Sequence, residues 1–227
     1  MATLERTNSD KDTPRLVGIA FLLQAVASAV VGLVLLNPLI VPGNIVDTMI
    51  NFSGSVLQVR AGIVGEMVTV IALVLLSALL YVTLQKHGSK IALVALGLRL
   101  TEVALLAVSR VSTFALLRTS QAFVVEGRPI YLKTLGELFY ETQSFTYSLN
   151  MVFFTLGATL FYYLIYKSRS VPRALALVGL IAAPLAFVGT VIDLLGYSVP
   201  LIVFLPNLPF ELAIGLWLVI KGMRRSA

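Results

Sequence analysis

Ionisable side chains occur deep inside segments that are otherwise apolar. Glu102 lies twelve residues beyond Lys90, and Glu211 lies ten residues before Lys221. At about 1.5 Å per helical residue, these separations are roughly 18 Å and 15 Å. Both carboxylates would therefore lie near the middle of a bilayer. Arg99 precedes Glu102 by three residues, so the two side chains would share one helix face.

A second group of polar residues is predicted nearer the other membrane surface. Its members come from four apolar segments at depths that agree to within a turn or two. They are Arg60, Glu66, Arg110, Glu141, Gln143 and Asp193. We expect Arg110 or Arg60 to pair with Glu66 or Asp193. Tyr147 and Asn150, in the fourth apolar segment, could line a cavity.

A charged side chain at the bilayer centre costs at least ~2.5–3.5 kcal/mol. The mid-depth carboxylates must therefore be paired, protonated or exposed to a wet cavity. We expect Arg99 to neutralise Glu102, Glu211 or both. Intramembrane ionisable residues indicate function by default, yet such pairs can also serve only to fix helix register. Both interpretations stay open for the mid-depth residues, and the structural one is favoured for the second group.

The elements that position these residues are predicted to be membrane helices. The chain has 227 residues, of which 58% are hydrophobic and 12% are charged, whereas soluble domains average about 25% charged residues. Continuous apolar runs of about 20 residues favour spanning helices over the short alternating strands of a barrel. Six spans are expected, and the fold class is an all-α, polytopic transmembrane bundle. The spans lie near residues 16–36, 57–84, 91–117, 137–166, 172–197 and 200–220.

The charge pattern predicts the orientation. Lys and Arg in short loops favour the cytoplasm, and most of them fall on the side that holds both chain ends. The expected topology is N-in and C-in, in the plasma membrane. The domain is expected over residues 16–221, with cytoplasmic polar tails at 1–15 and 222–227. The net charge of +6 does not indicate nucleic acid, because the basic residues lie at helix ends.

The sequence also predicts features of the segments that connect the spans. The longest loop is expected at residues 118–136, and a short interfacial helix at 46–52. Pro206 and Pro209 predict an unwound or kinked start to the last helix, because proline lacks the backbone N–H. Gly62 and Gly65 predict a close approach between helices.

The absence of cysteine excludes disulfides, thiolate nucleophiles and cysteine metal sites, and the single histidine, His87, excludes bis-histidine haem within the chain. We expect no metal and no cofactor. Membrane lipids are the expected surroundings.

Three motifs resemble one family. Residues 98–104 read LRLTEVA and are similar to its RLxEA signature, with Val103 departing from it. Residues 163–175 resemble its YLxxKSGxxPRxLG turn, with Arg169 in place of a glycine. Residues 211–222 resemble its ExxxxxWLLxKG ending. The chain thus resembles the bacterial and archaeal membrane family known as domain of unknown function 4386. This resemblance implies six helices, and it implies no particular activity.

Three functions remain open. The first is a carrier or a protein that binds a small apolar or amphipathic molecule or a lipid, with Glu102 and Glu211 titrating or holding a cation. The second is an intramembrane enzyme acting on a lipid-like or isoprenoid substrate, with Glu102, Glu211 or Asp193 as general acid. The third is a structural membrane subunit. No residue is assigned a catalytic role from the sequence.

Overall fold

The computed structural model describes residues 2–223, with side chains from residue 13 onward. The described chain forms seven α-helices joined by short helical turns. In order, these are α1 (Ala2–Ala29), a π-helix η1 (Val30–Leu36), a 3-10 turn η2 (Asn37–Leu39), α2 (Ile45–Gly54), α3 (Val56–Leu84), a 3-10 turn η3 (Gln85–His87), α4 (Ser89–Val125), α5 (Ile130–Ser168), α6 (Arg173–Leu194), a 3-10 turn η4 (Leu201–Val203) and α7 (Asn207–Lys221).

Six helical segments are long and apolar enough to cross a membrane. The first of them combines the end of α1 with η1 and η2, and the last combines η4 with α7. Helix α2, with ten residues, is too short to span and matches the short helix predicted at 46–52. The prediction of an all-α, polytopic bundle is therefore confirmed.

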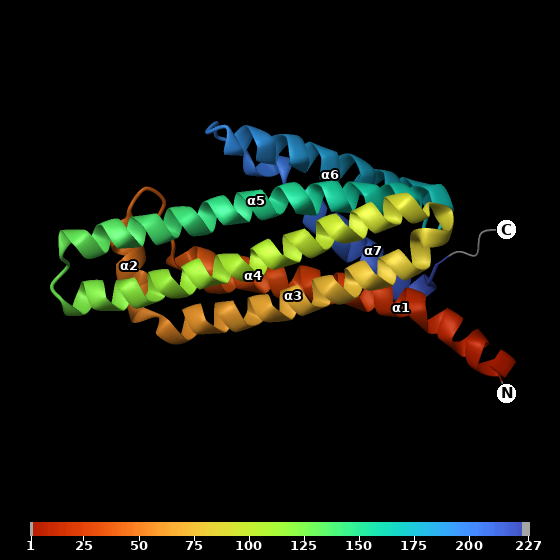
Figure 1. Cartoon of the computed structure of the whole chain (residues 1–227), viewed down its shortest axis with the longest axis horizontal. Helices are drawn as coiled ribbons and strands as arrows, with labels where there is room; N and C mark the ends of the chain where they lie inside the picture. Colours follow the sequence, from red (N-terminus) through yellow and green to blue (C-terminus); the bar gives the residue numbers. More distant parts are fainter. Residues whose placement is uncertain (1, 224–227) are drawn as a thin grey trace.

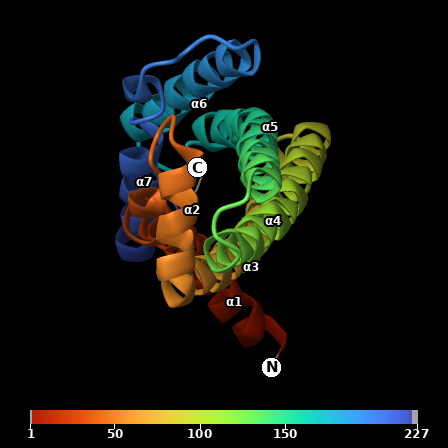
Figure 2. The same cartoon turned by 90° about the vertical axis from the view of Figure 1, so that its left-hand side faces the viewer.

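The six spans contact one another around a ring. Helix α1 packs on α3, α3 on α4, α4 on α5, α5 on α6, α6 on α7, and α7 returns to α1. Figure 2 shows this arrangement nearly end-on. Helix α1 starts and α7 ends at the same end of the bundle (Figure 1).

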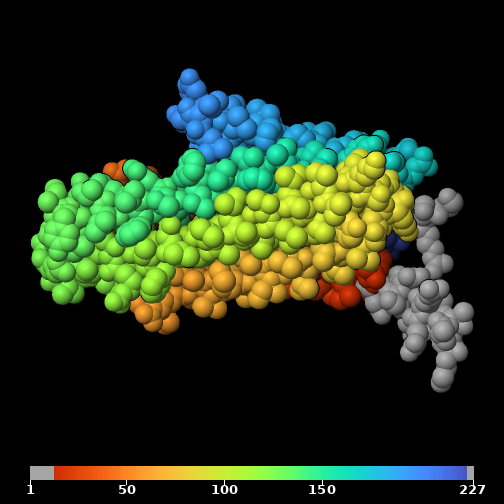
Figure 3. Space-filling view, in the orientation of Figure 1, coloured from red at the N-terminus to blue at the C-terminus, as the bar shows by residue number. Residues whose placement is uncertain are grey.

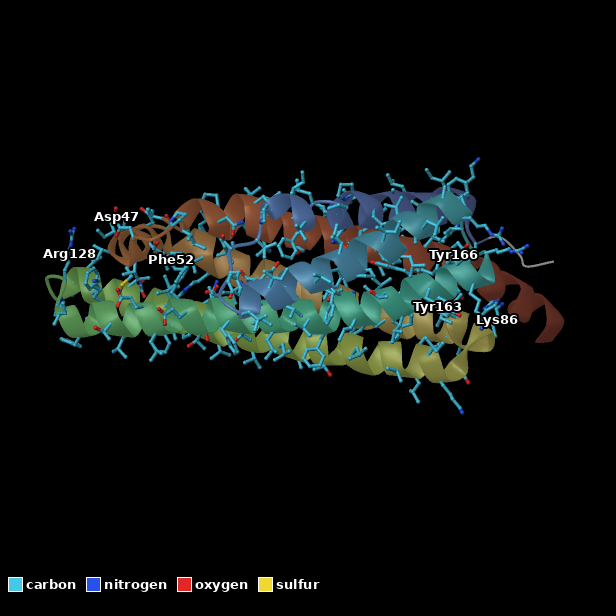
Figure 4. The ribbon with its side chains drawn as sticks, turned by 90° about the horizontal axis from the view of Figure 1, so that it is seen from above. Asp47, Phe52, Lys86, Arg128, Tyr163 and Tyr166 are labelled. Carbon is cyan, nitrogen blue, oxygen red and sulfur yellow. The ribbon has the colours of Figure 1, made fainter. Side chains whose placement is uncertain are left out.

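That end is called the basic end below. It holds Lys86 and Tyr166, whereas Asp47 and Arg128 lie at the opposite, distal end (Figure 4). The basic end also carries the connection from α5 to α6 and the last turn of α7. Its basic residues include Lys90, Lys167, Arg169, Arg173 and Lys221. The Lys and Arg residues that the sequence predicts on one side therefore lie at one end of the folded bundle.

The prediction of a long loop at residues 118–136 was wrong. Helix α4 continues to Val125 and α5 begins at Ile130, so the two are joined by a tight turn in which Gly127 and Arg128 have positive φ angles of 77° and 65°. The polar residues of this stretch alternate with apolar ones that are buried against α2. The residues buried there are Met49, Phe52, Leu116, Leu117, Phe123 and Leu132. The stretch is therefore amphipathic helix rather than loop.

The α4–α5 hairpin projects beyond the distal end of α6 (Figures 1 and 3). Helix α6 has 22 residues, or about 33 Å, which is enough to cross the hydrocarbon layer. The hairpin and α2 therefore form a lobe outside the layer that α6 spans.

The helix that contains the first span extends back into the predicted N-terminal polar tail. Helix α1 begins at Ala2, so its backbone is helical well before Leu16, where the first span was expected. The predicted C-terminal tail falls mostly on residues 224–227, which lie outside the described residues.

Nine of the fourteen buried residues of α4 recur at alternating intervals of three and four. They are Ala92, Ala95, Arg99, Glu102, Leu106, Ser109, Thr113, Leu116 and Ser120. This seven-residue repeat is the spacing of helices that cross at about 20°. One straight stripe of α4 thus faces the interior along its whole length.

Glycines allow the closest helix contacts. A Cβ at Gly62 or Gly65 would lie 2.7 Å from the side chain of Leu36 or Val31, which confirms the predicted close approach. A Cβ at Gly18 would lie 2.8 Å from the backbone oxygen of Gly215 in α7. Helices α1 and α7 therefore touch backbone to backbone at this point.

The unwound start of the last span is also confirmed. Helix α7 begins only at Asn207, after the short turn η4, and Pro206 is its N-cap. Asn207 is 8% exposed, and its side-chain amide donates to the Phe204 carbonyl over 3.3 Å. Non-helical backbone is tolerated at membrane depth only where protein or water surrounds it.

We predict that Gly18→Ala destabilises the protein by about 1–3 kcal/mol, the usual cost of overpacking a filled interior. The new methyl group meets backbone atoms of α7, which cannot rotate away as a side chain would. Unfolding in detergent, followed by circular dichroism, measures the effect. Gly97→Ala is the matched control, since its Cβ would meet nothing within 4 Å. Equal stability of Gly18→Ala and the wild type would disprove the backbone contact.

Candidate functional site

An ion pair lies at mid-depth in the bundle. Arg99 Nη1 is 2.8 Å from Glu102 Oε2, and both residues are 3% exposed. Neither atom has a well-aligned hydrogen bond to a described residue, so the attraction is mainly ionic. The i, i+3 spacing on α4 places the two groups on the same face, as the sequence predicted.

Helix α5 shapes the space around this pair. A Cβ at Gly157 would lie 2.9 Å from Arg99 Cγ, so only glycine leaves room for the arginine stem. The guanidinium carbon is 5.1 Å from the centre of the Phe154 ring, within the range of a cation–π interaction. Asn150 Nδ2 donates to the Glu102 backbone oxygen over 2.7 Å. These contacts hold the pair in one position.

Glu211 of α7 approaches the pair from the other side of the ring. It is 7% exposed, and its Oε2 accepts a 2.9 Å hydrogen bond from Gln24 Nε2 of α1. The Tyr162 hydroxyl approaches the same carboxylate, and the Tyr162 ring packs edge-on against Phe210 at 4.7 Å. Glu211 lies within electrostatic range of both Arg99 and Glu102. The structure therefore brings together Arg99, Glu102 and Glu211.

Sequence reasoning missed Gln24 and Tyr162. Gln24 is the only amide side chain inside the first apolar segment, and the cost of burying an unpaired amide could have marked it for a partner. Tyrosines are common at membrane interfaces, so no sequence signal marked Tyr162 as an interior residue. It is only 3% exposed because it lies on the inward face of α5.

A second polar group lies between the pair and the distal end. Glu66 of α3 is 5% exposed, Arg110 of α4 is 7% exposed, and their charges attract each other across the two helices. Tyr147 of α5 lies within electrostatic range of Glu66, Arg110 and Glu102. Tyr147 is 49% exposed, so it lies at the surface of the bundle.

Three other residues of the predicted group are not part of this interior. Arg60 and Glu141 are exposed. Asp193 is exposed as well, and its Oδ2 accepts a 2.9 Å hydrogen bond from Ser148 Oγ. Of the expected combinations, Arg110 with Glu66 is the one in which both residues are buried, and Arg60 and Asp193 take no part in it. Arg60 lies off the α3 face that buries Val59, Gly62 and Glu66.

The described interior contains more acid than base. Among described residues, the buried charged side chains are Glu66, Glu102, Glu211, Arg99 and Arg110. Three carboxyl groups thus face two guanidinium groups. Arg99 contacts Glu102 and Arg110 attracts Glu66, which leaves Glu211 with an amide and a hydroxyl as close partners. One Glu211 oxygen, Oε1, has no hydrogen bond of good geometry to a described residue.

A hollow of about 620 Å³ lies elsewhere, where η1 meets the start of α3. It is open and shallow, and no ionisable residue lines it. Gln58 closes one side by donating 3.0 Å and 3.4 Å hydrogen bonds to the carbonyl oxygens of Leu35 and Val34 in the π-helix. The hollow is therefore separate from the carboxylates.

We predict that Arg99→Met destabilises the protein by about 3–5 kcal/mol, because Glu102 would remain buried without its cation. Arg99→Met combined with Glu102→Leu should recover most of the loss, since neither charge is then left alone. Unfolding in detergent measures both. Lys133→Met is the control, because its ion pair with Glu137 is exposed and contributes at most about 1 kcal/mol. Similar losses at both positions would contradict the assignment of a buried pair.

Comparison with known sequences places the bundle in a family. The family described as Domain of unknown function (DUF4386) matches residues 16–222. No curated protein matches the chain, and no solved structure does. The match covers all six spans, so the resemblance carried by the three motifs is confirmed. The chain belongs to the DUF4386 family of integral membrane proteins.

Proposed function

We propose that this protein is a carrier of the plasma membrane whose interior binds and releases a proton at Glu211. The basic end would face the cytoplasm, which follows from the preference of Lys and Arg in short loops for that side. Lipid would surround the bundle, where apolar side chains such as Leu33, Val64 and Ile181 are exposed.

The charge balance of the interior carries the proposal. Three buried carboxyl groups and two buried guanidinium groups leave one negative charge without a cation. An uncompensated charge at this depth costs at least ~2.5–3.5 kcal/mol. One proton removes that cost. Glu211 is the carboxyl group that takes it, because Glu102 and Glu66 each have an arginine.

The surroundings of Glu211 favour a proton over a larger cargo. Gln24, Tyr162 and Phe210 pack around the carboxyl group. No cluster of three or more metal-ligating side chains occurs among the described residues. A proton needs no space beyond a hydrogen bond, whereas a solute would need these side chains to move.

The two other functions have less support. An enzyme acting on a lipid-like substrate needs an opening beside a carboxyl group, whereas the hollow between η1 and α3 is lined by apolar and uncharged residues. That hollow would instead suit a small apolar or amphipathic ligand. A purely structural network would have each charge compensated, and Glu211 is not.

Infrared spectroscopy of the full chain in lipid nanodiscs tests the proposal. We predict a carboxylic-acid C=O band in the wild type that is lost in Glu211→Gln. The substitution keeps the size of the side chain and its hydrogen bonding to Gln24. Glu137→Gln, at an exposed position, should leave the band unchanged.

Two results would reject the proton site. One is the absence of the band from a folded wild-type protein. The other is a band that persists in Glu211→Gln. Circular dichroism of each variant shows whether it is folded.

A further inference from the structure

Arg60 is an exposed arginine near the start of α3, and it forms no ion pair with a described residue. Helix α3 has 29 residues, or about 43 Å, which exceeds the ~30 Å hydrocarbon layer. Its first turns therefore lie at the level of the lipid headgroups on the distal side. An exposed cation at this level takes its counter-ion from outside the chain.

The hollow between η1 and α3 opens beside this arginine. Its volume is about 620 Å³, within the ~300–1,000 Å³ typical of small-molecule sites. Five of the eight residues that line it are apolar, among them Val34, Leu57 and Ala61. Leu57 is 83% exposed and Val34 is 59% exposed. An open apolar hollow on the lipid-facing surface suits a hydrocarbon chain that lies along it.

Hydrogen bonds between η1 and α3 hold the walls of the hollow in place. The Gln58 side-chain amide donates to the carbonyl oxygens of Leu35 and Val34 over 3.0 Å and 3.4 Å. These carbonyls belong to a π-helix, whose bonds join residues five apart, as the Asn37 N–H does with the Gly32 oxygen. The hollow is therefore formed by the fold itself, before any ligand binds.

The polar groups of the site lie at its distal end. Helical side chains lean toward the N-terminus of their helix, so the Arg60 side chain covers the turn that contains Leu57. Ser55 and Gln58 line the hollow at the same level, whereas Ala61 lies about 9 Å deeper than Ser55. Polar groups thus precede apolar ones from the distal surface inward. A phospholipid in a bilayer has the same order.

We propose that an anionic phospholipid of the distal leaflet binds here, with one hydrocarbon chain in the hollow and its phosphate on Arg60. Charge complementarity selects an anionic lipid, because no acidic residue lines the hollow. A zwitterionic lipid carries its own cation, which competes with Arg60 for the phosphate. The site is separate from Glu211, so it goes beyond the proposed proton binding and does not depend on it.

Fluorescence quenching of the full chain in vesicles tests the site. The chain has no cysteine, so a fluorophore can be attached to Val64→Cys alone. Val64 is exposed and lies seven residues beyond Leu57 on the same face of α3. Phosphatidylglycerol with brominated chains should associate there about fivefold more strongly than phosphatidylcholine with the same chains, the usual effect of one basic residue on anionic lipid.

Val108→Cys on α4 is the matched control for the position of the fluorophore. Val108 is exposed, and it lies nineteen residues from Ser89 at the basic end, whereas Val64 lies twenty residues from Leu84 at that end. The two brominated lipids should quench equally at Val108. Equal quenching by the two lipids at Val64 of the folded protein would overturn the proposal.

Arg60→Gln tests the contact with the phosphate. The preference for phosphatidylglycerol at Val64 should disappear, and Arg60→Lys should keep most of it. Arg118→Gln removes another exposed arginine, on α4, and should leave the preference unchanged. A preference that persists in Arg60→Gln would rule out the assigned contact.

Ala61→Trp tests the place of the hydrocarbon chain. The indole should fill the hollow and abolish the preference although Arg60 remains, whereas Ala104→Trp, exposed on α4, should not. Glycerol phosphate, which has the headgroup phosphate but no chains, should not displace the lipid. Displacement by glycerol phosphate, or a preference that survives in Ala61→Trp, would contradict a bound chain. Circular dichroism shows that each variant is folded.

Discussion

The Arg99–Glu102 pair is the interaction on which the interior depends. Two opposite charges 2.8 Å apart can remain in a low-dielectric medium only if neither is left alone. Three neighbouring residues of α5 help to hold the two charges together. Gly157 leaves space for the arginine stem, Phe154 lies against the guanidinium, and Asn150 bonds to the Glu102 carbonyl. Glu211 lies near an arginine that is already paired with Glu102. Glu211 therefore has no cation of its own, whereas Glu102 has one.

The fold could be predicted from the sequence because a helix needs about 20 apolar residues to cross the bilayer. Apolar runs mark the spans, and counting residues from the basic turns places Glu102 and Glu211 at the same depth. Spacing along one helix is equally reliable, which is why Arg99 and Glu102 were assigned to one face. These inferences need only the geometry of a single helix.

Rotation of the helices could not be predicted in the same way. Arg60 and Glu66 belong to the same turns of α3, yet Glu66 faces inward and Arg60 outward. The difference is set by which face of α3 packs on η1, where Gly62 and Gly65 leave room for Leu36 and Val31. The helical hairpin over residues 118–136 was missed for a related reason. Its polar residues resemble a loop until Met49 and Phe52 of α2 cover the apolar face between them.

The seven-residue repeat of α4 keeps one line of its residues facing the interior along the length of the helix. When every third or fourth residue faces the interior, position in the sequence corresponds directly to depth. Along this stripe Ala92 and Ala95 are followed by Arg99 and Glu102, and beyond them Leu106 and Leu116 alternate with Ser109, Thr113 and Ser120. Other helices supply groups that complement each level, with Ala158 and Phe161 beside the alanines and Gln143 beside Thr113. One buried ion pair is sufficient to fix helix register, so neither the second level at Glu66 and Arg110 nor the additional carboxyl group of Glu211 is needed for it.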